Sequence, residues 1–140
     1  MNAWKFLVAA QLLLAGLAQG AHAQLLIGQT VGVTGSAAVT VKESMRGAQL
    51  YFDAVNARGG INGQKVEVLT LDDKFDPKLT LENARTLVKD KNVLALFMTR
   101  GTPHTVGILP VLEEGGVPLV GPSTGAMVLH QPVRKYVFNV

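Results

Sequence analysis

The stretch VLALFM, residues 93–98, decides the fold, together with TRGTPH at residues 99–104. The first segment is apolar throughout, and a strand that is apolar at every position is typical of a parallel sheet covered on both faces. The second segment carries a charge, a glycine, hydroxyls, a proline and an imidazole. This abrupt change predicts a strand that ends at Met98 and is followed by a polar loop.

Strand and helix patterns alternate on both sides of this stretch. Further strands are predicted over residues 25–33, 65–73, 117–121 and 135–140. Three helices are predicted. The first runs from Glu43 to the stop signal Gly59–Gly60 and has an apolar stripe of Met45, Ala48, Phe52 and Val55. The second is capped by Asp76–Pro77 and has an apolar face of Leu81, Ala84, Leu87 and Val88, and the third runs from Pro103 to about Glu114 and is ended by Gly115–Gly116.

This alternation predicts an α/β fold, a parallel sheet with helices on both faces and right-handed crossovers. Ligands of such sheets bind outside the carboxyl ends of the strands. Three loops are expected there, after Val33, after Met98 and after Gly121.

The N-terminal segment, residues 1–23, has the order of a secretory signal peptide: one lysine, an apolar run and AHA before an expected cut at Gln24. The chain contains no cysteine, so we expect no lipid anchor, disulfide or thiolate metal site. The formal net charge is +3, and the basic residues are scattered. This charge pattern argues against a nucleic-acid partner.

Enzyme signatures are missing from the sequence. There is no P-loop, dinucleotide fingerprint or serine elbow. His104 and His130 do not form a ligand pair, so no metal is expected, and a lone histidine such as His104 is more often a surface or capping residue. Asp72 and Asp73 are adjacent and point to opposite faces, so they are interpreted as solvated loop residues or caps rather than an acid–base pair.

The loop over residues 100–105 has features of an anion site. Thr102 is expected to be the N-cap of a helix, with Pro103 its first residue, and Gly101 lets a ligand approach the backbone. Free N–H groups at a helix start attract a carboxylate or phosphate. This loop alone fits ordinary capping equally well, but GPSTGA at residues 121–126 adds Ser123 and Thr124 at the next strand end, and together the loops favour a small-anion or amino-acid site.

Three motifs give the chain a family resemblance: NARGGINGQKVEV at residues 56–68, DDKFDPK at 72–78 and VPLVGPSTGA at 117–126. In them the chain resembles the substrate-binding proteins of ABC importers, of the branched-chain amino-acid (leucine/isoleucine/valine) type. The resemblance implies a type I periplasmic binding fold with residues 24–140 as its N-terminal lobe. It also implies a periplasmic solute-binding component with no enzymatic activity or cofactor and with an inner-membrane permease as partner.

The resemblance also implies ligand contacts. Thr102 matches a hydroxyl position after the third strand, and Ser123 and Gly125 match a pair after the fourth. Relatives carry threonine at the position of Gly125, so here either the backbone of Gly125 serves or Thr124 substitutes. Arg100 is a further candidate, through its positive potential. Thr40 lies where relatives place an aromatic wall, so aromatic acids, amides and other small carboxylates stand beside leucine as ligands.

Family chains are much longer than this one. The second lobe and the segment that completes the first are therefore expected to be absent, and the chain is expected to bind ligand weakly or not at all. Two other functions stay open: a ligand-sensing module of the same fold, and, less favoured, an exported Rossmann-like enzyme that would depend on His104.

Overall fold

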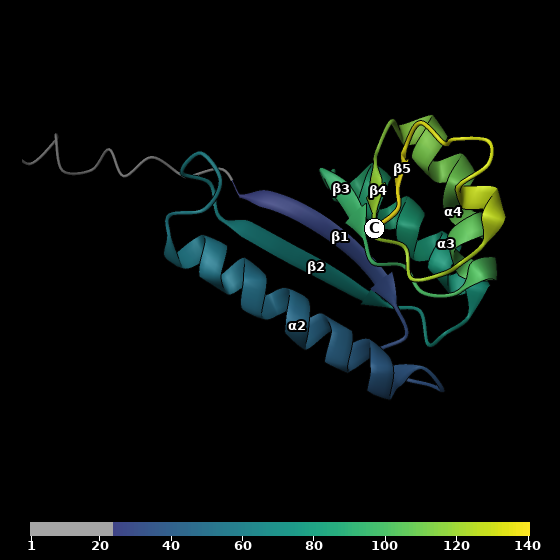
Figure 1. Ribbon diagram of the computed structural model, residues 1–140, viewed down its shortest axis with the longest axis horizontal. Coiled ribbons are helices and arrows are strands. Elements are labelled where there is room, and N and C mark those ends of the chain that lie inside the picture. Colours follow the sequence, from purple (N-terminus) through teal and green to yellow (C-terminus); the bar gives the residue numbers. More distant parts are fainter. Residues whose placement is uncertain (1–23) are drawn as a thin grey trace, which may run out of the picture.

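The computed structural model describes residues 24–140, and the predicted signal peptide, residues 1–23, lies outside the described residues. Its five strands form one parallel sheet in the order β2-β1-β3-β4-β5 (Figure 1). Their bounds are β1 Leu25–Val31, β2 Val66–Asp72, β3 Ala95–Phe97, β4 Leu119–Val120 and β5 Val137–Phe138. All five predicted strands are thus confirmed, although each is shorter than its predicted range.

The helices follow the strands as the sequence predicts. They are α2 Ala38–Ala57, α3 Pro77–Arg85 and α4 Thr102–Gly115, with a π-helical turn Thr86–Asp90 that extends α3 and a 3-10 turn Met127–Leu129. Asp76 caps α3 by accepting the Lys78 N–H at 2.8 Å, as the Asp–Pro pair predicts. Gly116, with a φ of 64°, ends α4 in the left-handed conformation that glycine favours.

Helix α2 begins earlier than predicted. The segment TGSAAVT, residues 34–40, is expected to be a loop because it is small and polar, but α2 already begins at Ala38. The predicted stripe of α2 does face the sheet: Val41 is buried, and Met45, Ala48, Phe52 and Val55 are half-buried. After α2, Asn62 and Gly63 both have positive φ, the geometry of the tight turn that their sequence predicts.

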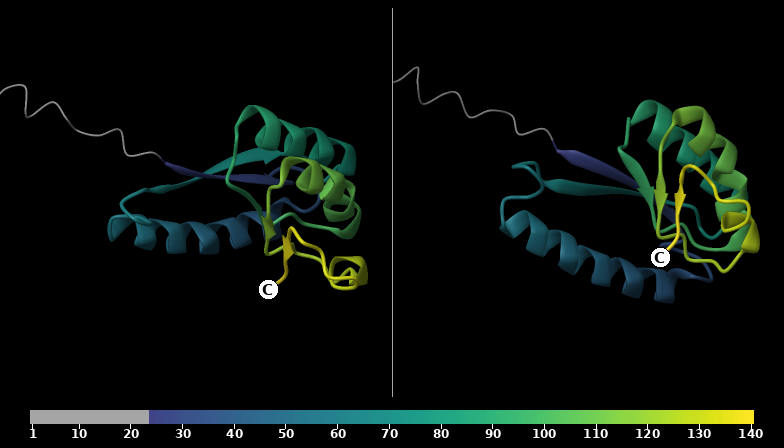
Figure 2. Two further views of the ribbon diagram at one scale, coloured as in Figure 1. Left: turned by 90° about the horizontal axis from the view of Figure 1, so that it is seen from above. Right: turned by 45° about the horizontal axis from the view of Figure 1, so that its top comes forward.

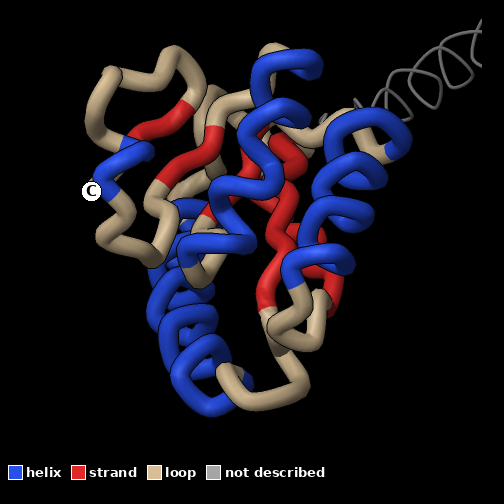
Figure 3. Tube along the Cα trace, turned by 90° about the vertical axis from the view of Figure 1, so that its right-hand side faces the viewer, coloured by secondary structure: helices blue, strands red, loops and turns tan. Residues whose placement is uncertain are grey.

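Helices lie on both sides of the sheet (Figure 2, Figure 3). Helix α2 lies along β1 and β2 on one side, whereas α3 and α4 lie on the other and pack against each other. Within residues 24–140, no helix is both long and apolar enough to cross a membrane.

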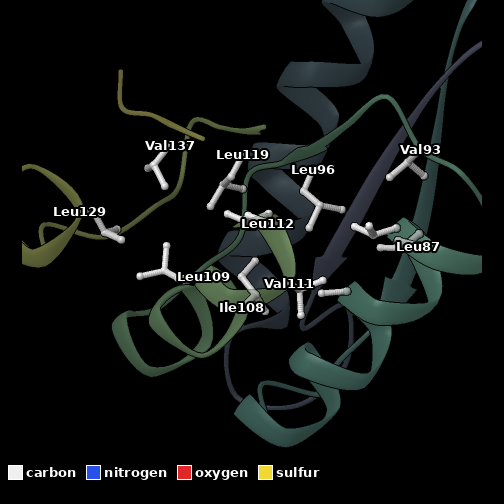
Figure 4. Packing of buried hydrophobic residues seen from close by; sticks show 12 residues of the cluster. Leu87, Val93, Leu96, Ile108, Leu109, Val111, Leu112, Leu119, Leu129 and Val137 are labelled. Atoms are coloured by element: carbon white, nitrogen blue, oxygen red, sulfur yellow. The ribbon is translucent and has the colours of Figure 1, made fainter. Parts of the chain in front are cut away.

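The core lies between the sheet and the α3–α4 layer. Strand residues Leu96, Leu119 and Val137 pack with residues of α4 in one cluster (Figure 4). Leu96, Leu112 and Leu119 have no exposed surface. Burying a leucine side chain fully contributes about 1.5–3 kcal/mol, so this cluster fixes α4 on the sheet.

The prediction that the central strand is covered on both faces holds only on the α3–α4 side. On the other side, Phe97 is half-buried and meets α2 through Phe52, with ring centroids 5.7 Å apart. Leu94, just before β3, is 60% exposed. Among the described residues, α2 covers β1 and β2 but leaves the α2 side of the later strands open.

Candidate functional site

The loops after β3 and β4 meet at the carboxyl edge of the sheet. Arg100 and Ser123 form a parallel bridge beyond the named strands. The Ser123 N–H donates to the Thr99 carbonyl at 2.7 Å, and the Gly101 N–H donates to the Ser123 carbonyl at 3.3 Å. These backbone bonds bring together the two loops that the sequence analysis selects.

Helix α4 starts one residue earlier than predicted. Gly101 is the N-cap, with φ 95° and ψ 144°, so Thr102 is the first helical residue and the prediction that Thr102 is the N-cap is wrong. The reason is the backbone at residue 101, because its positive φ is open to glycine and costly for other residues. Thr105 closes the turn, since its N–H and its hydroxyl both donate to the Gly101 carbonyl at 3.0 Å.

The start of α4 leaves backbone donors without a partner in the helix. The N–H groups of a first helical turn lack partners within the helix, and Pro103 has none to offer. Because Thr105 bonds to Gly101, the N–H groups of Thr102 and His104 are those left for a ligand. Together with the positive end of the helix dipole, they suit a carboxylate or a phosphate.

Two hydroxyls flank these amides. The side chains of Thr102 and Thr124 share a hydrogen bond of 2.6 Å, and the Ala126 N–H donates to Thr124 Oγ1 at 3.3 Å. Thr102 and Ser123 are exposed, and Thr124 is half-buried. A hydroxyl can donate and accept, so the pair can rearrange to donate to an anion at the helix start.

The two other candidate residues, Gly125 and Thr40, lie in different elements, Gly125 in the loop after β4 and Thr40 in helix α2. Gly125 is exposed between Thr124 and Ala126, so its backbone lies beside the site. Thr40 belongs to the first turn of α2, is exposed, and donates its hydroxyl to the Ala37 carbonyl at 3.1 Å. The bonding of Thr40 is that of an ordinary helix start.

Arg100 lines a small recess beside the same edge. The recess has a volume of about 50 Å³ and is lined by Val31, Val41, Ser44, Met98, Arg100 and Ser123. Arg100 is half-buried and belongs to neither of the two ion pairs found among residues 24–140. It therefore adds positive potential next to the start of α4.

His104 corrects a second expectation. It is predicted to be a surface or capping residue, but only 3% of it is exposed, and its ring stacks on Phe75 with centroids 4.4 Å apart. Among the residues that the structure describes, it alone has buried side-chain polar atoms without a partner, Nδ1 and Nε2. Leaving a buried polar group unpaired costs about 1–3 kcal/mol, so packing must hold this ring in place.

The two aspartates at the end of β2 have structural roles. Asp73 is buried rather than solvated and accepts the hydroxyls of Thr30 at 3.2 Å and Thr80 at 2.9 Å. Asp72 accepts hydrogen bonds from Thr34 and from the Lys74 N–H. Desolvation raises the pKa of Asp72, but the hydrogen bonds from Thr34 and Lys74 outweigh it and hold the pKa below its ordinary value of 3.8.

Residues 24–140 bring together no three His, Asp or Glu side chains that could hold a metal ion. What the carboxyl edge offers instead is hydroxyls, backbone amides and one arginine. In parallel α/β sheets ligands bind outside the carboxyl ends of the strands, and this patch lies at that edge.

The family follows from comparison with known proteins. Residues 24–140 match the family model described as "Periplasmic binding protein", so the chain belongs to this family. It is 35% identical over 106 residues to the Leu/Ile/Val-binding protein homolog 7 of Brucella suis, which covers 76% of this chain and 26% of that protein. It is 30% identical to the amino acid binding protein of Pseudomonas aeruginosa, covering 78% of this chain and 29% of that one.

Solved structures agree on the fold, which is that of the type I periplasmic binding proteins. A substrate-binding periplasmic protein from Ralstonia solanacearum superposes with a TM-score of 0.78 at 34% identity, over 84% of this chain and 33% of that one. A second match is the branched-chain amino acid transporter substrate binding protein of Streptococcus pneumoniae, solved with isoleucine. It superposes with a TM-score of 0.74 at 28% identity, over 84% of this chain and 33% of that one. These relatives are named as binding proteins rather than as enzymes.

The chain spans about a quarter of the length of the curated relatives that it matches. The matched residues correspond to about a third of each of the two longer structures. The activity of the whole protein is therefore a matter for proposal.

Proposed function

We propose that the chain provides one wall of the ligand site in an extracytoplasmic solute-binding component of an ABC importer, with a branched-chain amino acid or a related small carboxylate as ligand. The observation that carries the proposal is the start of α4. There Gly101 leaves the helix amides accessible, and the hydroxyls of Thr102 and Thr124 meet at 2.6 Å.

The patch suits the carboxylate of an amino acid. An anion at a helix N-terminus receives N–H donors and the favourable dipole without any metal. Thr102 and Thr124 add hydroxyl donors, Ser123 and Gly125 lie on the same loop, and Arg100 adds positive charge nearby. Relatives named for leucine, isoleucine and valine, and one solved with isoleucine, support a ligand of this class.

The ligand's side chain is less constrained by these residues. Residue 40 is a threonine whose hydroxyl bonds within its own helix, so no aromatic wall stands at that position. Branched-chain, aromatic and amide ligands therefore all fit the proposal, and contacts from the rest of the longer protein would choose among them.

Location and partner follow from the same proposal. The family implies a periplasmic location, and the pattern of residues 1–23 supports export through a signal peptide. The chain lacks cysteine, so the exported protein would carry no lipid on a cysteine, and its partner would be an inner-membrane ABC permease.

The test is the substitution Thr102→Val, which removes the hydroxyl but keeps the shape of the side chain. A hydrogen bond to a charged group contributes about 1.5–3 kcal/mol, so the affinity for leucine should fall on the order of 10- to 100-fold. A matched control is Thr86→Val in the π-helical turn after α3, which should leave affinity unchanged. Equal leucine affinity in the wild type and in Thr102→Val, measured by NMR titration, contradicts the proposal.

A receptor domain of the same fold is the second candidate. An extracellular ligand-binding receptor from Verminephrobacter eiseniae superposes with a TM-score of 0.78 at 29% identity, over 84% of this chain and 34% of that one. Both candidates use the same wall of the ligand site. Stimulation of a permease ATPase by the ligand-loaded protein would favour the importer, and its failure would favour the receptor.

A further inference from the structure

Phe75 has an unusual backbone conformation directly after β2. Lys74 and Phe75 both have positive φ angles, 52° and 61°, which residues other than glycine rarely adopt. The Lys74 N–H donates to Asp72 and the Phe75 N–H to Asp73, each at 2.9 Å. The aspartates thus stabilise a strained turn that brings Phe75 against α4.

His104 meets Phe75 from the first turn of α4. The two rings stack with their centroids 4.4 Å apart and an angle of 25° between their planes. Only 3% of His104 is exposed, and neither ring nitrogen has a partner among the residues described. A histidine that makes no hydrogen bond contributes here through the flat shape of its ring.

The stacked rings lie directly against the turn that precedes Thr102. A Cβ atom on Gly101 would lie 2.7 Å from His104 Nδ1 and 3.4 Å from Phe75 Cε2. A Cβ on Gly32 would lie 2.9 Å from the backbone nitrogen of Phe75. The backbone of Phe75 is therefore close to the loop after β1, and its ring is close to the loop after β3.

We propose that Phe75 and His104 are positioning residues for ligand recognition. They touch no ligand, but their stacked rings fix the backbone of Gly101 and so aim the N–H and hydroxyl of Thr102. Among the described residues, Gly101 itself bonds to the loop after β4 only through its N–H, at a long 3.3 Å to the Ser123 carbonyl. Packing by the two rings therefore adds to the bonds from Thr105 that close the turn. The expected effect on ligand binding rests on the proposed function, whereas the contacts of the two rings with Gly101 do not.

The experiment compares His104→Ala with His104→Phe and Phe75→Ala with Phe75→Tyr. It measures the amide shifts and hydrogen-exchange rates of Gly101 and Thr102 in the ligand-free chain, and then the affinity for leucine. The alanine variants should move both amides, speed their exchange and weaken leucine binding. His104→Phe should resemble the wild type, because it keeps a flat ring and removes nitrogens that have no partners.

Two results would overturn the inference. One is that His104→Ala leaves the Gly101 and Thr102 amides and the leucine affinity unchanged. The other is that His104→Phe is as damaged as His104→Ala, which would mean that the imidazole nitrogens matter. If an alanine variant does not fold, Phe75→Leu replaces it, because leucine keeps apolar volume without the flat ring. The shifts and exchange rates of the Gly101 and Thr102 amides in that variant then test the positioning role. The amide measurements are made on the ligand-free chain, so they decide the positioning role even if the wild type binds no leucine.

Discussion

At the scale of single residues, the site depends on a backbone conformation rather than on a reactive side chain. Gly101 has φ 95° and ψ 144°, and in the proposed site this conformation presents the first amides of α4 to the ligand. Such a region is essentially restricted to glycine.

The substitution Gly101→Ala should therefore destabilise the chain. The backbone strain and the contact with His104 at 2.7 Å should lower the free energy of unfolding by about 1–3 kcal/mol, measured by urea denaturation. Gly47→Ala is the control, because that glycine lies within α2 with no atom within 4 Å of an added Cβ. It should stabilise the helix by about 0.5–1 kcal/mol, and a Gly101→Ala variant as stable as the wild type would refute the strain.

Asp72 makes stability depend on pH. Its folded-state pKa is depressed, so its contribution is fully present well above the ordinary value of 3.8 and is lost as pH falls through the folded pKa. The difference in free energy of unfolding between the wild type and Asp72→Asn should accordingly shrink in acid below 3.8. If this difference in free energy of unfolding stayed constant from neutral pH to below 3.8, hydrogen bonds to the charged Asp72 carboxylate would not be its source.

Residue-scale roles were only partly predictable. The polar character of residues 100–105 and 121–126 is plain in the sequence, and so is the suitability of the start of α4 for an anion. The sequence does not show that Gly101 rather than Thr102 is the N-cap, because the positive φ of Gly101 goes with contacts to the distant residues Ser123 and Phe75. It also does not show that His104 is buried, since the ring covering it comes from Phe75 on a distant loop.

At the scale of elements, α4 links the site to the core. Its N-terminus carries Thr102 and its buried face carries Ile108 and Leu112. The position of the ligand-facing amides is therefore set by packing against β3 and β4 (Figure 4).

The substitution Leu112→Ala should test this packing. Leu112 has no exposed surface, so truncation should cost about 2–5 kcal/mol in the free energy of unfolding. Leu50→Ala is the matched control, because Leu50 lies on the outer face of α2 and is 73% exposed. Equal losses in the two variants, measured by denaturant unfolding, would mean that the α4 layer is not the main core.

Elements were predicted well where local signals were strong. The Asp76–Pro77 pair and the double glycines after α2 and at the end of α4 mark helix ends through backbone chemistry that acts locally. The start of α2 was missed because residues 34–40 are small and polar, as in a loop, and their tertiary setting overrides this weak preference. The cover of β3 could not be inferred either, since it depends on which helix reaches which strand.

At the scale of the whole molecule, the parallel sheet brings the ends of β3 and β4 together. Their registers place Phe97 opposite Val120, so Arg100 and Ser123 meet shortly beyond. The alternation of strands and helices predicts such an edge. The pairing of the two loops through Thr102 and Thr124 is visible only in the structure.

The central claim is that this edge holds the carboxylate of a small amino acid. The most direct measurement maps amide shifts of the ¹⁵N-labelled chain during titration with leucine and, separately, with isopentylamine, which has the same side chain without the carboxylate. We predict that leucine shifts the amides of Thr102, His104 and Thr124, whereas isopentylamine leaves them in place. Equal shifts with both compounds, or leucine shifts confined to residues away from this edge, would contradict the account.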